Sequence, residues 1–336
     1  MRSVVMPTGG EGDGAAGPRS TDVTVIGLGC MALAGAYGAA RETEATRVLE
    51  KAIDLGITHF DTADVYGAGA NERLVGRVLK AHRGAVVIAT KGGATRTADN
   101  RASNDGSPRY LRQACEDSLR RLGIDCIDLY YLHRVDPAVP IEDSVGALAD
   151  LVSAGKVRAI GLSEVAPDTL LRAHRVHPVA AVQTEYSLAY REAEAEIIPL
   201  CRKLGALFVA YSPLGRGLLG GVMMADQAFG PGDIRAGIPR FDAAHLGGNL
   251  ALVQNLRQIA NTEQMTLAQL ALAWVLSREE HVIAIPGTRS EARLIENAAA
   301  AGLTLSPAAR QALDRSLVAA VQGARHSPQM LARTNL

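Results

Sequence analysis

The sequence predicts a single (β/α)8 TIM barrel with long loops at the carboxyl-terminal face of its strands. Eight short runs rich in β-branched residues alternate with stretches whose apolar residues recur at the helical period. This alternation is typical of a parallel sheet covered by helices, and eight repeats close such a sheet into a barrel. The chain has 336 residues, of which 48% are hydrophobic, enough to build this α/β fold as one domain over residues 22–336.

The expected strands are Val23–Gly27, Thr58–Asp61, Val86–Thr90, Ile127–Leu132, Val157–Gly161, Ala181–Gln183, Leu207–Tyr211 and Val282–Ile285. The expected helices between them include Glu44–Leu55, Arg109–Leu122, Val145–Ala154 and Glu194–Leu204. Several of these stretches end at a glycine. A glycine just past a helix adopts the left-handed conformation that turns the chain back toward the sheet.

Two segments depart from the alternation. The Gly-rich run at residues 8–20 indicates that residues 1–21 form a flexible N-terminal segment. The connection from Ser212 to about Leu250 is rich in Gly and Pro and is long for a compact domain. Because it follows a strand, we expect it at the carboxyl-terminal face, where barrel active sites are built.

Charge and composition exclude several classes of protein. Lys and Arg together number 35, as do Asp and Glu, and no basic block stands out, so we expect no nucleic-acid partner. No stretch approaches the length of a membrane span, and no secretory leader is visible. The four cysteines form no CxxC pair, which suits free thiols in a reducing compartment. We therefore expect a cytoplasmic protein without a membrane partner or a metal site.

One motif suggests a different nucleotide-binding fold. The run Gly27-Leu28-Gly29-Cys30-Met31-Ala32 matches the glycine fingerprint of Rossmann domains. That reading needs a helix at once and an acidic residue about 20 positions on. Here no helix is expected before about Arg41, and the next strand ends only at Asp61. A barrel strand leading into a substrate loop, with Met31 near the substrate, fits better.

Four polar residues stand at or just after successive strand ends: Asp61, Tyr66, Lys91 and His133. Each could have an ordinary structural role by itself. An Asp after a strand usually caps a helix, a lone Tyr or His usually packs locally, and a Lys beside glycines is usually exposed. Four such residues in register on one rim of a barrel favour a shared site.

The motifs that carry these residues resemble those of the aldo-keto reductase family, from about residue 22 to 320. They are Asp61-Thr62-Ala63-Asp64-Val65-Tyr66-Gly67, Asn71-Glu72, Thr90-Lys91-Gly92 and Asp128-Leu129-Tyr130-Tyr131-Leu132-His133. The resemblance implies an NADP(H)-dependent oxidoreductase that reduces an aldehyde or ketone to an alcohol, or runs the reverse reaction. Tyr66 would be the general acid and base, and His133 would orient the carbonyl oxygen.

Simple energetics make these implied roles plausible. The usual pKa of tyrosine is about 10, so deprotonating a tyrosine at pH 7 costs roughly 4 kcal/mol. A Lys91 ammonium about 4 Å away would supply roughly 4 kcal/mol at an effective dielectric of 20. Lys91 could therefore stabilise the phenolate of Tyr66, while Asp61 keeps Lys91 charged.

The same resemblance implies where the cofactor NADP(H) binds. Ser163 and Gln183 would bind the nicotinamide carboxamide and Tyr211 would stack on its ring, while Glu164 replaces the usual Asn. Phosphates are expected at the loop after Tyr211 and at the segment after the last strand. Those residues are Ser212, Leu214, Gly215, Arg216 and Gly217, then Ile285, Gly287, Thr288, Arg289, Arg293, Glu296 and Asn297. Arg289 and Arg293 favour NADP(H) over NAD(H), although Gly287 replaces the common Lys.

Substrate and alternative functions remain open from sequence. Gly93 and Ala189 stand where relatives often carry aromatic residues, which indicates a wider pocket for a bulky substrate. A barrel of this kind can also serve as an NADP(H)-binding redox-sensing or channel-associated subunit with little turnover. A third alternative is a non-redox barrel that uses Lys91 as a Schiff base. The substrate, the direction and the oligomeric state are not specified.

Overall fold

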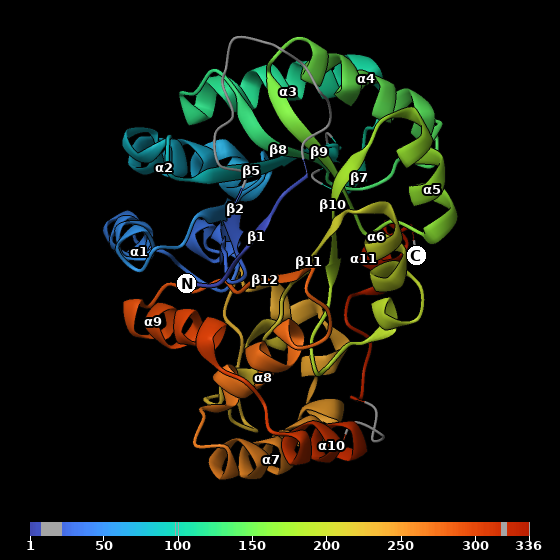
Figure 1. The fold of residues 1–336 in the computed structure, drawn as a ribbon. Coiled ribbons are helices and arrows are strands. Elements are labelled where there is room, and N and C mark those ends of the chain that lie inside the picture. Colours follow the sequence, from blue (N-terminus) through green and yellow to red (C-terminus); the bar gives the residue numbers. More distant parts are fainter. Residues whose placement is uncertain (8–21, 98, 100, 317–320, 336) are drawn as a thin grey trace.

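The computed structural model describes residues 1–7, 22–97, 99, 101–316 and 321–335, and its centre is a parallel eight-stranded barrel (Figure 1). The strands, in spatial order, are β3 (Leu28–Gly29), β4 (His59–Asp61), β5 (Val87–Gly92), β8 (Ile127–Leu132), β9 (Val157–Ser163), β10 (Val179–Glu185), β11 (Leu207–Tyr211) and β12 (Val282–Ile285). The first strand closes onto the last, since the Gly27 N–H donates to Ala284 O at 2.8 Å and the Ala284 N–H to Val25 O at 2.9 Å. The predicted fold class is confirmed.

Helices surround the barrel (Figure 1). They are α1 (Glu42–Asp54), α2 (Ala70–Leu79), α3 (Pro108–Leu122), α4 (Ile141–Ser153), α5 (Pro167–Val176), α6 (Ile197–Leu204), α7 (Ala243–Thr262), α8 (Leu267–Leu276), α9 (Glu291–Ala299), α10 (Pro307–Ser316) and α11 (Pro328–Leu331). The residues at the start of α3 explain why the helix begins there. The Ser107 side chain accepts a hydrogen bond from the Tyr110 N–H at 3.3 Å, and Pro108 follows in the first turn. Gly123 then ends the helix with φ 65°.

The predicted strand Val23–Gly27 is divided in the structure. Its first part, β2 (Asp22–Thr24), pairs antiparallel with β1 (Ser3–Val5) outside the barrel, and the barrel strand follows. Residues 3–5, which the sequence assigns to a flexible segment, thus belong to the fold, and Met6 is 1% exposed. An uninterrupted apolar run gives no signal of where a chain leaves one sheet and enters another. The Gly-rich run at residues 8–20 lies outside the described residues.

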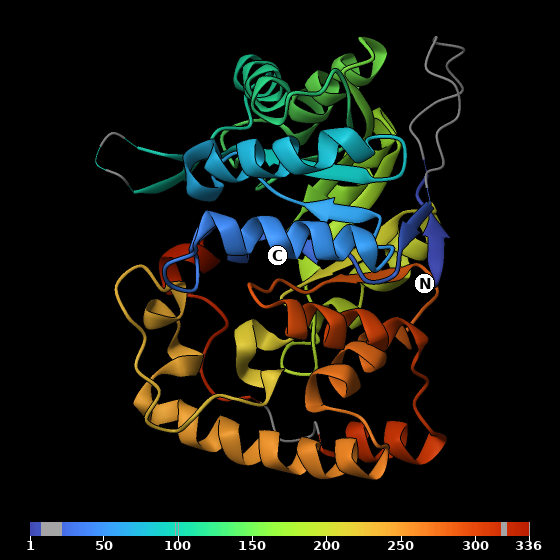
Figure 2. The ribbon, with the colours of Figure 1, turned by 90° about the vertical axis from the view of Figure 1, so that its left-hand side faces the viewer.

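Two helices begin at residues other than those predicted, and a proline near each start accounts for the difference. The helix predicted from Val145 begins at Ile141, directly after Pro140. The helix predicted from Glu194 begins at Ile197, after a 3-10 turn at Glu192–Glu194. Pro199 lacks an N–H and must lie in the first turn, so the helix starts just before it. The long α7 and α10 pack against each other outside the ring (Figures 1 and 2).

The two ends of the barrel differ. The β1–β2 hairpin lies at one end, and the hairpin of β6 (Ala94–Arg96) and β7 (Ala102–Asn104) lies at the other, together with α11 (Figure 2). The long connection after β11 reaches toward the loop after β3, because the Ile234 N–H donates to Ala36 O at 3.0 Å. Loops at the carboxyl-terminal ends of the strands therefore converge on one mouth. None of the helices described is long and apolar enough to cross a membrane.

Candidate active site

The ends of two neighbouring strands bring together a lysine and an aspartate deep in the barrel. Asp61 ends β4, and Lys91 lies near the end of β5. The Lys91 side chain is fully buried, and its ammonium donates to the Asp61 carboxylate and, at 2.8 Å, to Thr62 O. Gln183 Nε2 donates to the other Asp61 oxygen at 2.8 Å. Asp61 is thus held between a cation and an amide.

Lys91 remains a cation in this buried position. Burial alone lowers the pKa of Lys91, but the charge of Asp61 and the contacts with Tyr66 outweigh it, and the pKa is raised. The prediction that Asp61 keeps Lys91 charged is in accord with this direction. A fixed positive charge therefore lies beneath the mouth of the barrel.

Tyr66 lies above that charge. It begins the 3-10 turn η2 (Tyr66–Gly69), and Lys91 Nζ is 5.3 Å from the centre of its ring. Burial raises the pKa of Tyr66, and Lys91 and Arg134 reduce this rise without cancelling it. Lys91 therefore acts in the expected direction on the pKa of Tyr66, but in the protein alone desolvation of the phenolate outweighs it and the net shift is upward.

His133 completes the group at the end of β8. Its ring meets the ring of Tyr66 edge-on, with centroids 6.0 Å apart and planes at 83°. Burial, Arg134 and Lys91 hold the pKa of His133 well below its usual range, so the imidazole is neutral. Within the described residues its Nδ1 has no hydrogen-bond partner. A neutral imidazole still carries one N–H that can donate to a carbonyl oxygen.

The Asn71-Glu72 motif supports these strand ends. Thr62 Oγ1 donates to Asn71 Oδ1 at 2.6 Å, and Thr90 Oγ1 donates to Glu72 Oε1 at 2.6 Å. Arg121 pairs with the second Glu72 oxygen at 2.5 Å. These bonds fix the start of α2 against the residues that follow Asp61 and precede Lys91.

A second feature is a pocket of about 340 Å³ between the loop after β11 and the segment after β12. The sequence-predicted residues along its wall are Leu214, Gly217, Gly287, Thr288, Arg293, Glu296 and Asn297. Within the described residues Asn297 Oδ1 is buried without a hydrogen-bond partner. The structure therefore brings these two distant segments together around one cavity.

Sequence reasoning missed Arg235, which also lines this pocket. Its guanidinium pairs with Asp233 at 2.6 Å and lies over the rings of Phe229 and Tyr37, at 4.7 and 5.2 Å. The available signal was the unusual length of the loop that carries it. That length did not indicate which residue of the loop faces the cavity.

Arg289 and Arg216 lie elsewhere than expected. Arg289 donates to the carbonyl oxygens of Tyr37, Gly38 and Ala39 and is not on the pocket wall, so it holds the loop after β3. Arg216 is buried, and its charge is matched by Glu185 at 3.0 Å. The charge of Arg216 is thus matched, whereas Arg289 is bound only by neutral carbonyls; a role of either in binding a cofactor phosphate stays a prediction.

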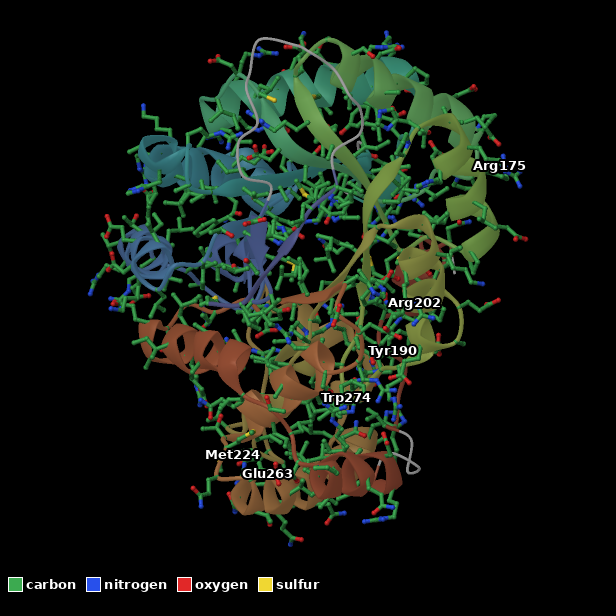
Figure 3. All side chains as sticks on the ribbon, in the orientation of Figure 1. Arg175, Tyr190, Arg202, Met224, Glu263 and Trp274 are labelled. Atoms are coloured by element: carbon green, nitrogen blue, oxygen red, sulfur yellow. The ribbon has the colours of Figure 1, made fainter. Side chains whose placement is uncertain are left out.

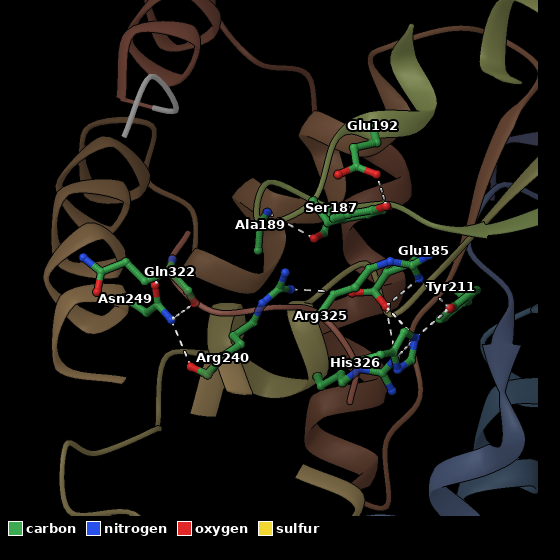
Figure 4. A network of polar contacts seen from close by, with 12 residues as sticks. Glu185, Ser187, Ala189, Glu192, Tyr211, Arg240, Asn249, Gln322, Arg325 and His326 are labelled. Atoms are coloured by element: carbon green, nitrogen blue, oxygen red, sulfur yellow. Dashed lines mark hydrogen bonds and ion pairs between the residues drawn. The ribbon is translucent and has the colours of Figure 1, made fainter. Parts of the chain in front are cut away.

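Buried acids and arginines join the predicted nicotinamide side to the C-terminal tail (Figure 4). Glu164, with φ 54°, accepts from Arg325 at 2.5 Å and from the Glu185 N–H at 3.0 Å. Although burial alone raises the pKa of Glu164, Arg134 and Arg325 outweigh it and lower the pKa. The Tyr211 hydroxyl lies 3.3 Å from Arg325 Nη1 and 3.4 Å from His326 Nε2.

The remaining predicted cofactor residues lie near these features. Ser163 Oγ accepts from Arg134 Nη1 at 3.0 Å. Ser212 and Gly215 have positive φ, at 49° and 56°, where the chain turns away from β11. Ile285 is the buried last residue of β12.

Of the two small residues predicted to widen the substrate pocket, Gly93 has a second reason to be small. Gly93 has φ 102°, and a Cβ there would lie 2.9 Å from the Leu132 side chain, so backbone and packing require the glycine. Ala189 is 8% exposed and packs beside Gly215. The wider substrate pocket stays a prediction. Met31 is partly exposed after β3.

Comparisons with known proteins extend this picture. The model of the aldo/keto reductase family matches residues 25–317. A probable aldo-keto reductase 1 from Glycine max is 48% identical over 292 residues, which span 86% of this chain and 84% of that protein.

Solved structures resemble the fold over nearly its whole length. A glycerol dehydrogenase from Gluconobacter oxydans matches with a TM-score of 0.83 and 30% identity, covering 94% of this chain and 95% of that chain. An aldo/keto reductase from Klebsiella pneumoniae, in complex with NADP and acetate, matches with a TM-score of 0.70 and 28% identity, covering 92% and 96%. Another from Klebsiella pneumoniae, in complex with NADPH, has a TM-score of 0.72 and 27% identity, covering 97% and 99%.

Proposed function

The chain belongs to the aldo/keto reductase family, and we propose that it reduces an aldehyde or ketone to an alcohol with NADPH, or catalyses the reverse reaction. The observation that carries this proposal is the buried Lys91 ammonium, paired with Asp61 and lying beneath the Tyr66 ring. The Lys91 cation would stabilise the phenolate of Tyr66, which lies toward the mouth of the barrel.

The pocket between the loop after β11 and α9 suits a dinucleotide cofactor. Its wall carries Arg235, which pairs with Asp233, and Arg293, which pairs with Glu296 at 2.7 Å; a phosphate there would add to or replace these carboxylate partners. The Asn297 amide oxygen, which has no partner among the described residues, could accept from a ring or amino donor. We propose that NADP(H) binds there; the two similar Klebsiella pneumoniae proteins were solved in complex with NADP and with NADPH. When bound, this cofactor supplies or accepts the hydride.

The protein's own part is to handle the proton and the carbonyl oxygen. In reduction the Tyr66 hydroxyl gives its proton to the oxygen, and the Lys91 charge stabilises the phenolate that remains. His133, whose low pKa keeps it neutral, donates a hydrogen bond to the same oxygen without competing as an acid. In oxidation the Tyr66 phenolate takes the proton back.

A turnover assay tests this function. Purified protein is mixed with excess NADPH and a panel of aldehydes and ketones, and the loss of NADPH absorbance is followed. We expect many equivalents of NADPH consumed per protein and loss of most of this activity in Tyr66→Phe. Consumption that stops at one equivalent would support a cofactor-binding subunit instead. Equal turnover in Tyr66→Phe would contradict the role of Tyr66.

A further inference from the structure

Two arginines near the catalytic group carry positive charge that the proton-transfer chemistry does not use. Arg134 directly follows His133; its Nη1 donates to His133 O at 2.7 Å and to Ser163 Oγ at 3.0 Å. Arg333 comes from the C-terminal tail and is partly exposed. Its Nε and Nη2 donate to Asn104 Oδ1 at 3.0 and 2.7 Å.

Specific contacts bring these arginines to the same side of the mouth. Asn104, which accepts from Arg333, donates through its own Nδ2 to Val135 O at 3.0 Å, one residue beyond Arg134. The Asn335 N–H donates to Glu164 O at 3.0 Å and so fixes the tail beside the end of β9. The β6–β7 hairpin, the segment after β8 and the tail therefore form one rim.

The positive charge on this rim is not neutralised within the described part of the chain. Neither Arg134 nor Arg333 makes an ion pair with a described residue; their acceptors there are hydroxyl, amide and backbone oxygens and, for Arg333, the sulfur of Met330. Glu164 lies within electrostatic range of Arg134, but its carboxylate is already bound by Arg325. Burial and the like charges of Arg134 and Arg96 lower the pKa of Arg333, which shows that cations gather here.

The same charges act on the reacting groups. Arg134 lowers the pKa of both Tyr66 and His133, and Arg333 lowers that of His133. Arg134 therefore lies within electrostatic range of both groups, and Arg333 within range of His133. Tyr66 and Arg333 are each partly exposed, whereas Arg134 is 8% exposed. Because Arg134 directly follows His133, whose ring meets that of Tyr66, the rim begins beside the residues that would hold the carbonyl.

From this arrangement we infer that the enzyme prefers carbonyl substrates that also carry an anionic group, in the simplest case a carboxylate, bound by Arg333 and Arg134. The inference rests on the proposed reductase function. A guanidinium presents a planar pair of donors that matches a carboxylate, and desolvated charge-assisted bonds of this kind change affinity by about ten- to a hundred-fold.

A matched pair of substrates tests the effect of the anionic group alone. Succinic semialdehyde and its methyl ester, methyl 4-oxobutanoate, have the same aldehyde and differ in the charge at the other end. We expect kcat/KM with NADPH to be at least about ten-fold higher for the acid, and this ratio to fall as salt is added. 4-Carboxybenzaldehyde and its methyl ester extend the comparison to a rigid aromatic aldehyde.

Variants of Arg333 test whether this residue causes the preference for the acid over the ester. Arg333→Gln should reduce the acid-to-ester ratio by about ten-fold or more, and Arg333→Lys should retain part of it because the charge remains. Arg175→Gln serves as the matched control, since Arg175 is exposed on α5, far from the mouth (Figure 3). It should leave the ratio unchanged.

The outcomes separate the two proposals. Turnover of the esters that depends on Tyr66 but shows no preference for the acids would overturn this inference and leave the reductase function standing. An unchanged ratio in a folded Arg333→Gln protein would overturn it as well. If that variant does not fold, a wild-type ratio insensitive to salt would overturn the inference in its place. If no carbonyl compound of either kind is turned over, both proposals fall.

Discussion

The Nη2 atom of Arg325 lies 2.5 Å from Oε2 of Glu164, and this contact joins residues 161 positions apart in the chain. Glu164 directly follows Ser163 at the end of β9, and Arg325 lies in the C-terminal tail. Both side chains are buried. The tail thus contributes to the position of a strand end that we expect to face the nicotinamide.

Breaking this buried pair should destabilise the fold. Arg325→Met or Glu164→Gln removes one member of the buried pair, a change that typically costs about 3–5 kcal/mol; in Glu164→Gln the loss should be at the lower end, because Arg325 keeps Glu185 at 3.5 Å. The double variant should lose less than the sum of the two single losses, because it leaves no unpaired charge. Urea unfolding measures all three. The exposed Arg175→Met control should stay within about 0.5 kcal/mol of the wild type, and fully additive losses would show that the pair is not coupled.

The pair also has a pH signature with a definite sign. The folded pKa of Glu164 is lowered below its ordinary 4.5 because Arg134 and Arg325 outweigh the effect of burial. Its contribution to stability is therefore present above 4.5 and is lost as the pH falls through the folded pKa. The difference in unfolding free energy between wild type and Glu164→Gln should be constant near neutral pH and shrink only in acid. A difference that shrinks as the pH rises would contradict this assignment.

Tyr66 and Lys91 should act as one unit in catalysis. Tyr66→Phe removes only the hydroxyl and should lower kcat by about 10²–10⁴-fold, the usual value of general acid catalysis. Lys91→Met should be comparably damaging, because burial alone raises the pKa of Tyr66 and little else opposes it. The double variant should be little worse than either single one. Multiplicative losses in steady-state rates would show that Lys91 acts separately.

His133 should remain neutral through the working range of the enzyme. Burial and the positive charges of Arg134 and Lys91 hold its pKa well below 6.5. Imidazole resonances followed by NMR should show no titration of His133 in mildly acidic solution, with free imidazole added as an internal reference. The acidic limb of the kcat profile should then persist in His133→Gln. A His133 resonance that titrates near 6.5 would contradict the buried, cation-flanked position.

The arginines around the pocket should divide into two kinds. Arg293 and Arg235 line the cavity, so Arg293→Ala and Arg235→Ala should weaken NADPH by about ten- to a hundred-fold and NADH much less. Arg289 instead holds the carbonyls of residues 37–39, so Arg289→Ala should weaken both cofactors alike. Fluorescence quenching titrations measure all three variants. Selective loss of NADPH in Arg289→Ala would restore the role first expected of that residue.

Gly93 should be required by the backbone. Gly93→Ala places a Cβ at φ 102° and 2.9 Å from Leu132 Cδ1, and strain of this kind costs about 1–3 kcal/mol. Gly84→Ala is the matched control, since Gly84 is exposed and a Cβ there would meet nothing within 4 Å. Urea unfolding should show a loss for the first variant and little change for the second. Equal stability of both would mean that the loop relaxes around the new methyl group.

Local patterns in the sequence were enough to predict the barrel and the order of Asp61, Tyr66, Lys91 and His133 along it. The periodicity of neighbouring residues predicts a buried strand or an amphipathic helix. Parallel strands then place their carboxyl ends on the same rim of the barrel, independently of the loop conformations. The contacts Arg325–Glu164 and Arg333–Asn104 follow no such rule. They join loops and a tail that have no periodic pattern, and their partners lie 161 and 229 positions apart. Only the closed barrel brings those segments together, so the tertiary structure alone decided which arginines are paired and which keep their charge at the mouth.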